Sequence, residues 1–123
     1  MVAYLLDSNL IIDYARGFEP TIRYLRATLK EQDKACMSVI TETELFAGKS
    51  FAKLEQFLEK EFRAIPLIVD SSIARRAGAL RREMNITISD ALIAATALEH
   101  HLTLITRNAK HFQGIPELKL ISS

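Results

Sequence analysis

Val2-Ala3-Tyr4-Leu5-Leu6-Asp7-Ser8-Asn9 opens the chain with five apolar or aromatic residues that are followed at once by an acid. An exposed strand would alternate apolar and polar side chains, so this run predicts a strand buried on both faces and central in a sheet. Either Asp7 or Ser8 can cap a helix that begins at Asn9. We therefore expect a carboxylate to be fixed where the strand becomes a helix.

The composition is that of one soluble globular domain over residues 1–123. Of all residues, 49% are hydrophobic and 25% are charged, and the formal net charge is +1. Because no net field attracts a polyanion, any affinity for nucleic acid must come from local placement of Lys and Arg. The single cysteine, Cys36, excludes a disulfide within the chain and is expected to be a buried thiol. The sequence has no basic leader and no apolar run of the ~20 residues that a membrane helix needs, so we expect a cytoplasmic protein with no membrane partner.

Strands and helices are expected to alternate along the rest of the chain. Further strands are predicted at residues 36–40, 65–69, 102–106 and 118–121, and Pro66 favours an edge position for the third strand. Helices are predicted at residues 9–15, 20–32, 41–48, 50–62, 70–84 and 90–98, the third capped by Thr41 and the fifth by Asp70. Right-handed strand–helix–strand units give a mainly parallel sheet with helices on both faces, which is an α/β fold of three layers. In such sheets ligands bind at the carboxyl ends of the strands.

Three carboxylates lie near that edge of the predicted sheet. Asp7 follows the first strand, Glu44 comes one turn after the second, and Asp90 begins the helix before the fourth. Three neighbouring acids repel one another, and a divalent cation removes the repulsion most directly. Because only oxygen donors are offered, we predict Mg²⁺ or Mn²⁺ rather than zinc. A carboxylate-bound Mg²⁺ suits phosphodiester chemistry, since it can activate a water and offset charge on the phosphate oxygens.

Each acid also has a purely structural interpretation. Asp7 and Asp90 can be capping acids at helix starts, which is a common reason for an aspartate there. Thr41-x-x-Glu44 fits a capping box, in which Glu44 reaches back to the amide of Thr41. Asp13 lies more than a turn beyond Asp7 and is expected at the surface.

Four segments, taken in order, resemble the PIN domain. They are Asp7-Ser8-Asn9 with Leu10-Ile11-Ile12-Asp13 behind it, Ser38-Val39-Ile40-Thr41 leading to Glu44-Leu45-Phe46-Ala47-Gly48, the helix over residues 90–97, and Leu104-Ile105-Thr106-Arg107-Asn108 before Phe112. The match spans essentially the whole chain. In size and loop pattern the chain is similar to the VapC-type toxin ribonucleases of toxin–antitoxin pairs.

This resemblance implies a single PIN-like domain over residues 1–123 that hydrolyses RNA phosphodiester bonds with Mg²⁺ or Mn²⁺. It also implies a homodimer and a cognate antitoxin protein whose tail fills the groove. Asp7, Glu44 and Asp90 match the acidic ligand positions of the family. The resemblance assigns site support to the hydroxyls of Ser8 and Thr106 and to the polar side chain of Asn108.

One position departs from the family pattern, because His111 stands where many relatives have a fourth acid. We therefore expect weaker binding of a second metal ion. The imidazole can touch a phosphate or a water, or it can simply belong to a surface loop.

Basic residues are predicted to hold the RNA backbone through phosphate contacts, which place a strand without reading its bases. Arg107 and Lys110 lie in the loop after the fourth strand. Arg75 and Arg82 project from one side of the helix that follows Asp70 and form the clearest basic face in the chain. Such a face is usually only solvated, which is the alternative interpretation.

Two functions of other classes fit the same fold. A receiver-like phosphoacceptor domain would have adjacent acids after the first strand and a lysine after the last, whereas Asp7 is solitary and Lys110 is a loose match. A non-catalytic PIN-like binding module is the second alternative, and the three intact acids argue against it.

Overall fold

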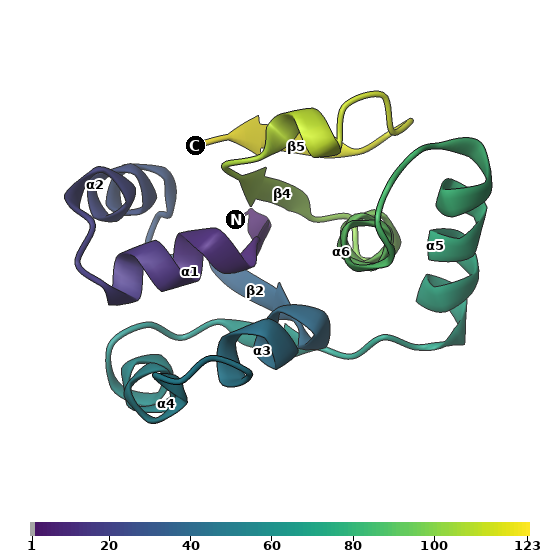
Figure 1. Cartoon of the computed structure of the whole chain (residues 1–123). Helices are drawn as coiled ribbons and strands as arrows, with labels where there is room; N and C mark the ends of the chain where they lie inside the picture. Colours follow the sequence, from purple (N-terminus) through teal and green to yellow (C-terminus); the bar gives the residue numbers. More distant parts are fainter. Residues whose placement is uncertain (1) are drawn as a thin grey trace.

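A five-stranded parallel sheet forms the middle layer of the computed structural model, which describes residues 2–123 (Figure 1). The strands lie in the order β3-β2-β1-β4-β5, and each neighbouring pair is parallel. Their bounds are β1 Ala3–Leu6, β2 Lys34–Ser38, β3 Ile65–Leu67, β4 Thr103–Thr106 and β5 Lys119–Ser122. The central position of β1 is confirmed, as is the edge position of β3, where the missing N–H of Pro66 is tolerated.

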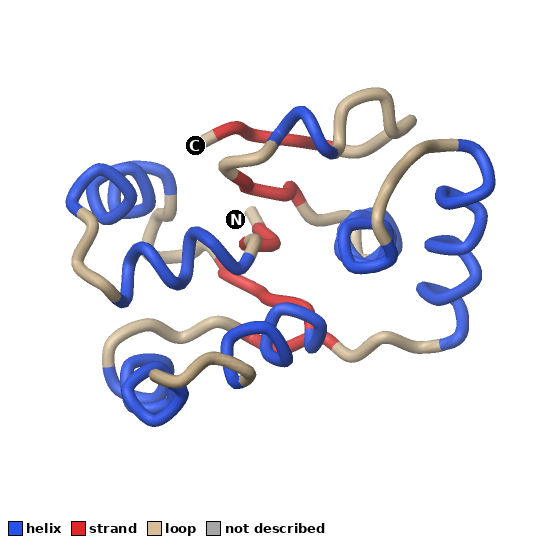
Figure 2. The backbone as a smooth tube through the Cα atoms, viewed as in Figure 1, coloured by secondary structure: helices blue, strands red, loops and turns tan. Residues whose placement is uncertain are grey.

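Helices cover both faces of the sheet (Figures 1 and 2). The helices of residues 2–123 are α1 Ser8–Ala15, α2 Glu19–Thr28, α3 Val39–Phe46, α4 Phe51–Lys60, α5 Ser71–Glu83 and α6 Ile88–Glu99, with a 3₁₀ turn η1 at Ala109–His111. Buried side chains of α1 to α4 pack on one face, and those of α5 and α6 pack on the other. The predicted three-layer α/β fold is therefore confirmed. No helix of the part described is long and apolar enough to cross a membrane.

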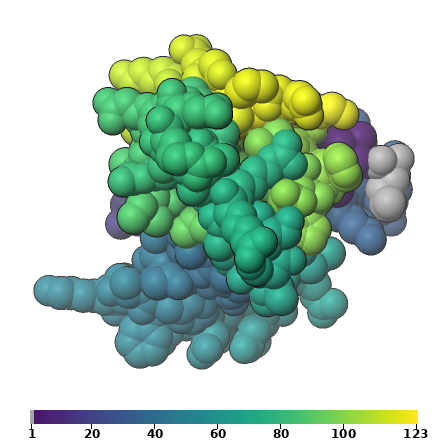
Figure 3. Space-filling view, turned by 90° about the vertical axis from the view of Figure 1, so that its right-hand side faces the viewer, coloured from purple at the N-terminus to yellow at the C-terminus, as the bar shows by residue number. Residues whose placement is uncertain are grey.

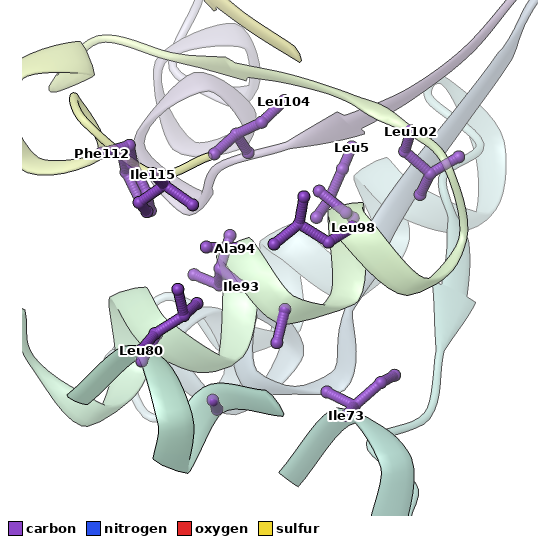
Figure 4. Packing of buried hydrophobic residues seen from close by; sticks show 14 of the residues in the cluster. Leu5, Ile73, Leu80, Ile93, Ala94, Leu98, Leu102, Leu104, Phe112 and Ile115 are labelled. Carbon is purple, nitrogen blue, oxygen red and sulfur yellow. The ribbon is translucent and has the colours of Figure 1, made fainter. Parts of the chain in front are cut away.

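Successive residues of β1 supply both layers of the core, because side chains alternate across a strand. Leu5 belongs to the cluster under α5 and α6, whereas Tyr4 and Leu6 belong to the cluster under α1 to α4. Figure 4 shows the first cluster, in which Leu5 of the sheet faces α6, and Ile93 and Ala94 of α6 lie between the sheet and α5. The small buried residues of α6 let this helix pack close to the sheet.

The junction of β2 and α3 differs from the prediction. Residues 39 and 40 are helical rather than extended, because the hydroxyl of Ser38 caps α3 by accepting from the N–H of Ile40 at 3.0 Å. Thr41, the predicted cap, lies inside α3, where it is fully buried and its hydroxyl has no hydrogen-bond partner among the described residues. Glu44 is consequently further along the helix than the sequence pattern indicated.

The second helix is shorter than predicted, because α2 ends at Thr28 and not at residue 32. Asp33 explains the early end. Its carboxylate accepts from the N–H of Lys30 at 3.0 Å and from the N–H of Val2 at 2.8 Å. These bonds fix the turn that brings β2 alongside β1. The predicted cap of α5 is confirmed, since the carboxylate of Asp70 accepts from the N–H of Ile73 at 2.9 Å.

Truncating the core at β1 is expected to destabilise the domain strongly. Leu5 is completely buried in the central strand, so Leu5→Ala should lower the free energy of unfolding by about 3 kcal/mol through lost burial and the cavity left behind. Ile68, which is 72% exposed, offers a matched control, and Ile68→Ala should cost less than about 0.5 kcal/mol. Urea unfolding followed by circular dichroism measures both, and equal losses in the two variants would contradict this packing.

Candidate active site

Asp7 is held in place at the junction of β1 and α1. One carboxylate oxygen accepts from the N–H of Ser8 at 2.9 Å, and the other accepts from the hydroxyl of Thr106 at 2.7 Å. The N–H of Asp7 donates to the carbonyl of Ile105 at 3.1 Å. Thr106 is completely buried and also accepts from the N–H of Asn108 at 3.0 Å. The ends of β1 and β4 are thus joined through one carboxylate, which stands at a helix N-terminus where negative charge is favoured.

Glu44 reaches the same edge from α3. Because Ser38 caps this helix, Glu44 is not the third residue of a capping box, and that structural interpretation is wrong. Much of the side chain is exposed, yet partial desolvation of the carboxyl raises its pKa. The charges of Asp7 and Asp90 raise the pKa further, and the hydroxyl of Ser8 opposes the shift. The acidic neighbours therefore add to a rise in the pKa that desolvation begins.

Asp90 lies in the first turn of α6 but does not cap that helix. Thr87 is the cap, because its hydroxyl accepts from the N–H of Asp90 at 3.1 Å. Desolvation raises the pKa of Asp90, the charge of Asp7 adds to the rise, and His111 opposes it. The Nδ1 atom of His111 is 3.5 Å from the nearer carboxylate oxygen of Asp90. The Asp90 side chain is therefore left available for something other than helix capping.

The acidic cluster, defined as Asp7, Glu44 and Asp90, therefore draws on three separate elements at one end of the sheet. The charge of Asp7 raises the pKa of both other acids, so the three carboxylates lie within electrostatic reach of one another. Over residues 2–123, however, no group of three acidic, histidine or cysteine side chains is placed so that all three could hold one metal ion. This arrangement fits a hard divalent ion that keeps several waters and is held by one or two carboxylates directly. It does not fit a tetrahedral zinc site.

Arg107 has partners that sequence analysis missed. Its guanidinium forms an ion pair with Asp13 and lies 5.9 Å from the centroid of the Phe18 ring. The side chain of Asp13 is 16% exposed, so it is more buried than the predicted surface position implies. The two residues are 94 positions apart, and no local pattern in the sequence could reveal the contact. Arg107 is thus already engaged in holding α1 against the loop after β4.

The arginines of the predicted basic face on α5 differ in their contacts. Arg76 pairs with Glu99 at 3.4 Å, and Arg81 donates to the carbonyl of Ile86 at 2.9 Å. Arg75 and Arg82 are exposed. Of these arginines, Arg81 is the one that lines a pocket with an acid of the cluster. The fold therefore brings a different arginine to the site than the helical pattern suggested.

Two pockets flank the acidic cluster. The first has a volume of about 460 Å³ and lies beside Asp90, between the end of α5 and η1. It includes Lys110 and His111, which the sequence placed at the site. The second pocket, of about 400 Å³, lies beside Glu44 between α1, α3 and α4. The cluster can therefore be approached from both sides by an extended ligand.

Comparison with known proteins finds a family model and curated relatives that match nearly the whole chain. The family model described as PIN domain matches residues 4–118. The chain is 34% identical to ribonuclease VapC19 of Mycobacterium tuberculosis, covering 94% of this chain and 96% of that protein. It is 36% identical to ribonuclease VapC10 of the same organism, covering 94% and 90% respectively.

Chains in solved structures match the same fold over nearly the whole chain. A toxin–antitoxin complex from Klebsiella pneumoniae contains a chain that is 34% identical, with a TM-score of 0.80 and coverage of 97% of this chain and 96% of that one. A chain of VapBC2 from Rickettsia felis, bound to a DNA fragment from their promoter, is 26% identical with a TM-score of 0.82 and covers 99% of both. The resemblance inferred from the four sequence segments is thereby confirmed.

Neutralising Asp90 is expected to stabilise the metal-free protein. A carboxyl whose pKa is raised by folding stabilises the fold when protonated, and this contribution is lost as the pH rises through the raised pKa. At pH 7 Asp90→Asn should therefore raise Tm by about 1–3 °C in the presence of a chelator. Differential scanning fluorimetry measures the shift.

Added Mg²⁺ should give the wild type a higher Tm than Asp90→Asn, because an ion that binds only the folded state stabilises the protein that binds it. The matched control is Glu59→Gln, a change of an exposed acid on α4, which should move Tm by less than about 1 °C. A clear fall in Tm for metal-free Asp90→Asn would count against the described electrostatics.

Proposed function

Because the chain belongs to the PIN domain family, within its VapC-type ribonucleases, we propose that it cleaves RNA with Mg²⁺ or Mn²⁺ held by Asp7 and Asp90, while Glu44 accepts the proton of the attacking water. The chain is then the toxin of a toxin–antitoxin pair. The observation that carries the proposal is the acidic cluster itself, whose three carboxylates come from separate elements, with the charge of Asp7 raising the pKa of both Glu44 and Asp90. Membership in the family leaves the receiver-like phosphoacceptor alternative without support.

The family is generally metal-dependent, and the donor set here consists of carboxylate oxygens, which hard divalent ions prefer. Asp7 and Asp90 would hold the ion directly or through water. When bound, the ion supplies positive charge beside the phosphate oxygens and makes an attacking water more acidic. Thr106 keeps the Asp7 carboxylate in one orientation, so little reorganisation is needed when the substrate arrives.

Glu44 is the residue best suited to move a proton. It is the most exposed acid of the cluster, and its raised pKa brings it nearer to the pH at which a general base works best. Its carboxylate accepts a proton from water as the water oxygen bonds to phosphorus and the bond to the leaving ribose oxygen breaks. The leaving oxygen takes its proton from solvent. His111 and Lys110 lie on the other side of Asp90, where they can contact the phosphate.

The pocket beside Glu44 offers a place for the antitoxin. Its floor contains Ile12, Leu54 and Phe57, and Lys49 and Lys53 stand on its rim. A protein segment with apolar side chains and flanking acids would match both the floor and the rim. Such a segment would end beside Glu44 and so prevent RNA from reaching the cluster. We also propose that the chain acts as a homodimer, as the resemblance implied.

Neutralising Asp7 or Glu44 should abolish RNA cleavage. Purified Asp7→Asn and Glu44→Gln proteins should cut total cellular RNA at least about 100-fold more slowly than wild type in Mg²⁺, and a chelator should have the same effect on wild type. The rate of appearance of new RNA ends measures this. Glu59→Gln serves as the control and should cut normally, because this acid is exposed on α4. Full activity of Asp7→Asn would eliminate the assignment, and metal binding without any cleavage by wild type would favour the non-catalytic module.

Thr106 is expected to act as a positioning residue through Asp7. Thr106→Val keeps the shape of the side chain but removes the 2.7 Å hydrogen bond to Asp7 and the acceptor for the N–H of Asn108, so the cleavage rate should fall by about 10- to 100-fold. Half-maximal activity should also need more Mg²⁺, whereas Thr106→Ser should restore both values. A titration of rate against Mg²⁺ concentration decides the question. Equal Mg²⁺ requirements in wild type and Thr106→Val would rule out this role.

A further inference from the structure

The pocket beside Asp90 has features that metal binding does not explain. It is formed by the end of α5, the segment between α5 and α6, and η1, which lie at the same end of the molecule (Figure 1). Figure 3 shows the C-terminal segment, in yellow, directly against α5, in green. Asp90 and His111 form one side of the pocket, while Asn85 and Gln113 line it as well. Its volume of about 460 Å³ lies in the range of sites that bind small molecules.

We propose that this pocket holds the nucleotide adjacent to the scissile phosphate of the RNA and selects its base through Asn85 and Gln113. The inference rests on the proposed RNA cleavage, because the acidic cluster defines where the scissile phosphate lies. It adds the part of the site that decides which nucleotide is accepted.

The two amide side chains have the chemistry that base selection needs. Each carries donors and an acceptor, so each can pair with the edge of an unstacked base. Both are exposed, and neither side chain makes a hydrogen bond to any other residue of the range 2–123. They come from different segments, since Asn85 follows α5 and Gln113 follows η1. A base placed between them would therefore be read from two directions.

The position of Gln113 is fixed by the turn that follows it. Gly114 has a φ of 84°, a conformation that side chains other than glycine rarely adopt. A Cβ atom at this position would lie 3.7 Å from the terminal methyl group of Met84, an ordinary van der Waals contact, so the turn runs beside a residue that lines the same pocket. The turn thus brings Gln113 close to the end of α5 without filling the pocket.

The remaining wall suits the flat face of a base. The guanidinium of Arg81 is held by its hydrogen bond of 2.9 Å to the carbonyl of Ile86, and Ile86 is buried beneath the pocket. Bases of single-stranded RNA stack on planar guanidinium groups and apolar side chains. Lys110 is exposed at the same pocket and can pair with a phosphate. The pocket therefore offers separate contacts for the face, the edge and the backbone of one nucleotide.

The first experiment compares cleavage preferences. Wild type, Asn85→Ala and Gln113→Ala are incubated with an RNA pool randomised over a single-stranded region, and the cut ends are sequenced. The preference for the base flanking the cut should weaken by about tenfold in each variant, because each loses a hydrogen-bonded contact to the base edge. Gln56→Ala, which removes an exposed amide on α4, should keep the wild-type preference. Unchanged preference in Asn85→Ala and Gln113→Ala, with wild type active, would overturn the inference and leave the proposed function standing.

The second experiment does not depend on cleavage. The side-chain amide signals of Asn85, Gln113 and Gln56 are followed by NMR while AMP, CMP, GMP or UMP is added to about 10 mM. Shifts at Asn85 and Gln113 with at least one nucleotide, and none at Gln56, support a nucleotide pocket even if no RNA is cut. If all four nucleotides leave Asn85 and Gln113 unmoved, the pocket does not bind nucleotides and the inference is wrong.

Discussion

The hydrogen bond between Thr106 and Asp7 is the contact on which the site depends. It joins residues 99 positions apart, at the ends of neighbouring strands β1 and β4, and it is buried. Losing the hydroxyl of Thr106 would leave the Oδ2 atom of the buried Asp7 carboxylate without this donor, at a cost of about 1–3 kcal/mol. The carboxylate is therefore oriented by the fold before any ligand binds. Glu44 and Asp90 are arranged around that fixed point by α3 and α6.

Bringing the three acids together opposes the stability of the domain. Desolvation and the charge of Asp7 raise the pKa of both Glu44 and Asp90, which means that their ionised forms are disfavoured in the fold. The rest of the structure compensates through the two apolar clusters on either face of the sheet. Such local unfavourable charge is common at functional sites.

Sequence patterns predicted the parts of the fold that depend on local chemistry. The apolar run of β1 indicated a central strand, and Asp70 indicated a cap, because both follow from neighbouring residues. The predicted start of α3 was wrong. Ser38 and Thr41 are both hydroxyl residues near a strand end, and periodicity does not show which of them caps the helix. The pairing of Asp13 with Arg107 and the site-facing position of Arg81 arise from contacts between distant segments. Local propensity contains no information on such contacts.

The strand order has a consequence for the timing of synthesis. Asp7 is synthesised 99 residues before Thr106, its hydrogen-bond partner at the end of β4. Until β4 pairs with β1, Asp7 has no bond from Thr106 and Asp13 has no Arg107 to bind. A nascent chain therefore lacks an assembled site until β4 has been synthesised and has paired with β1.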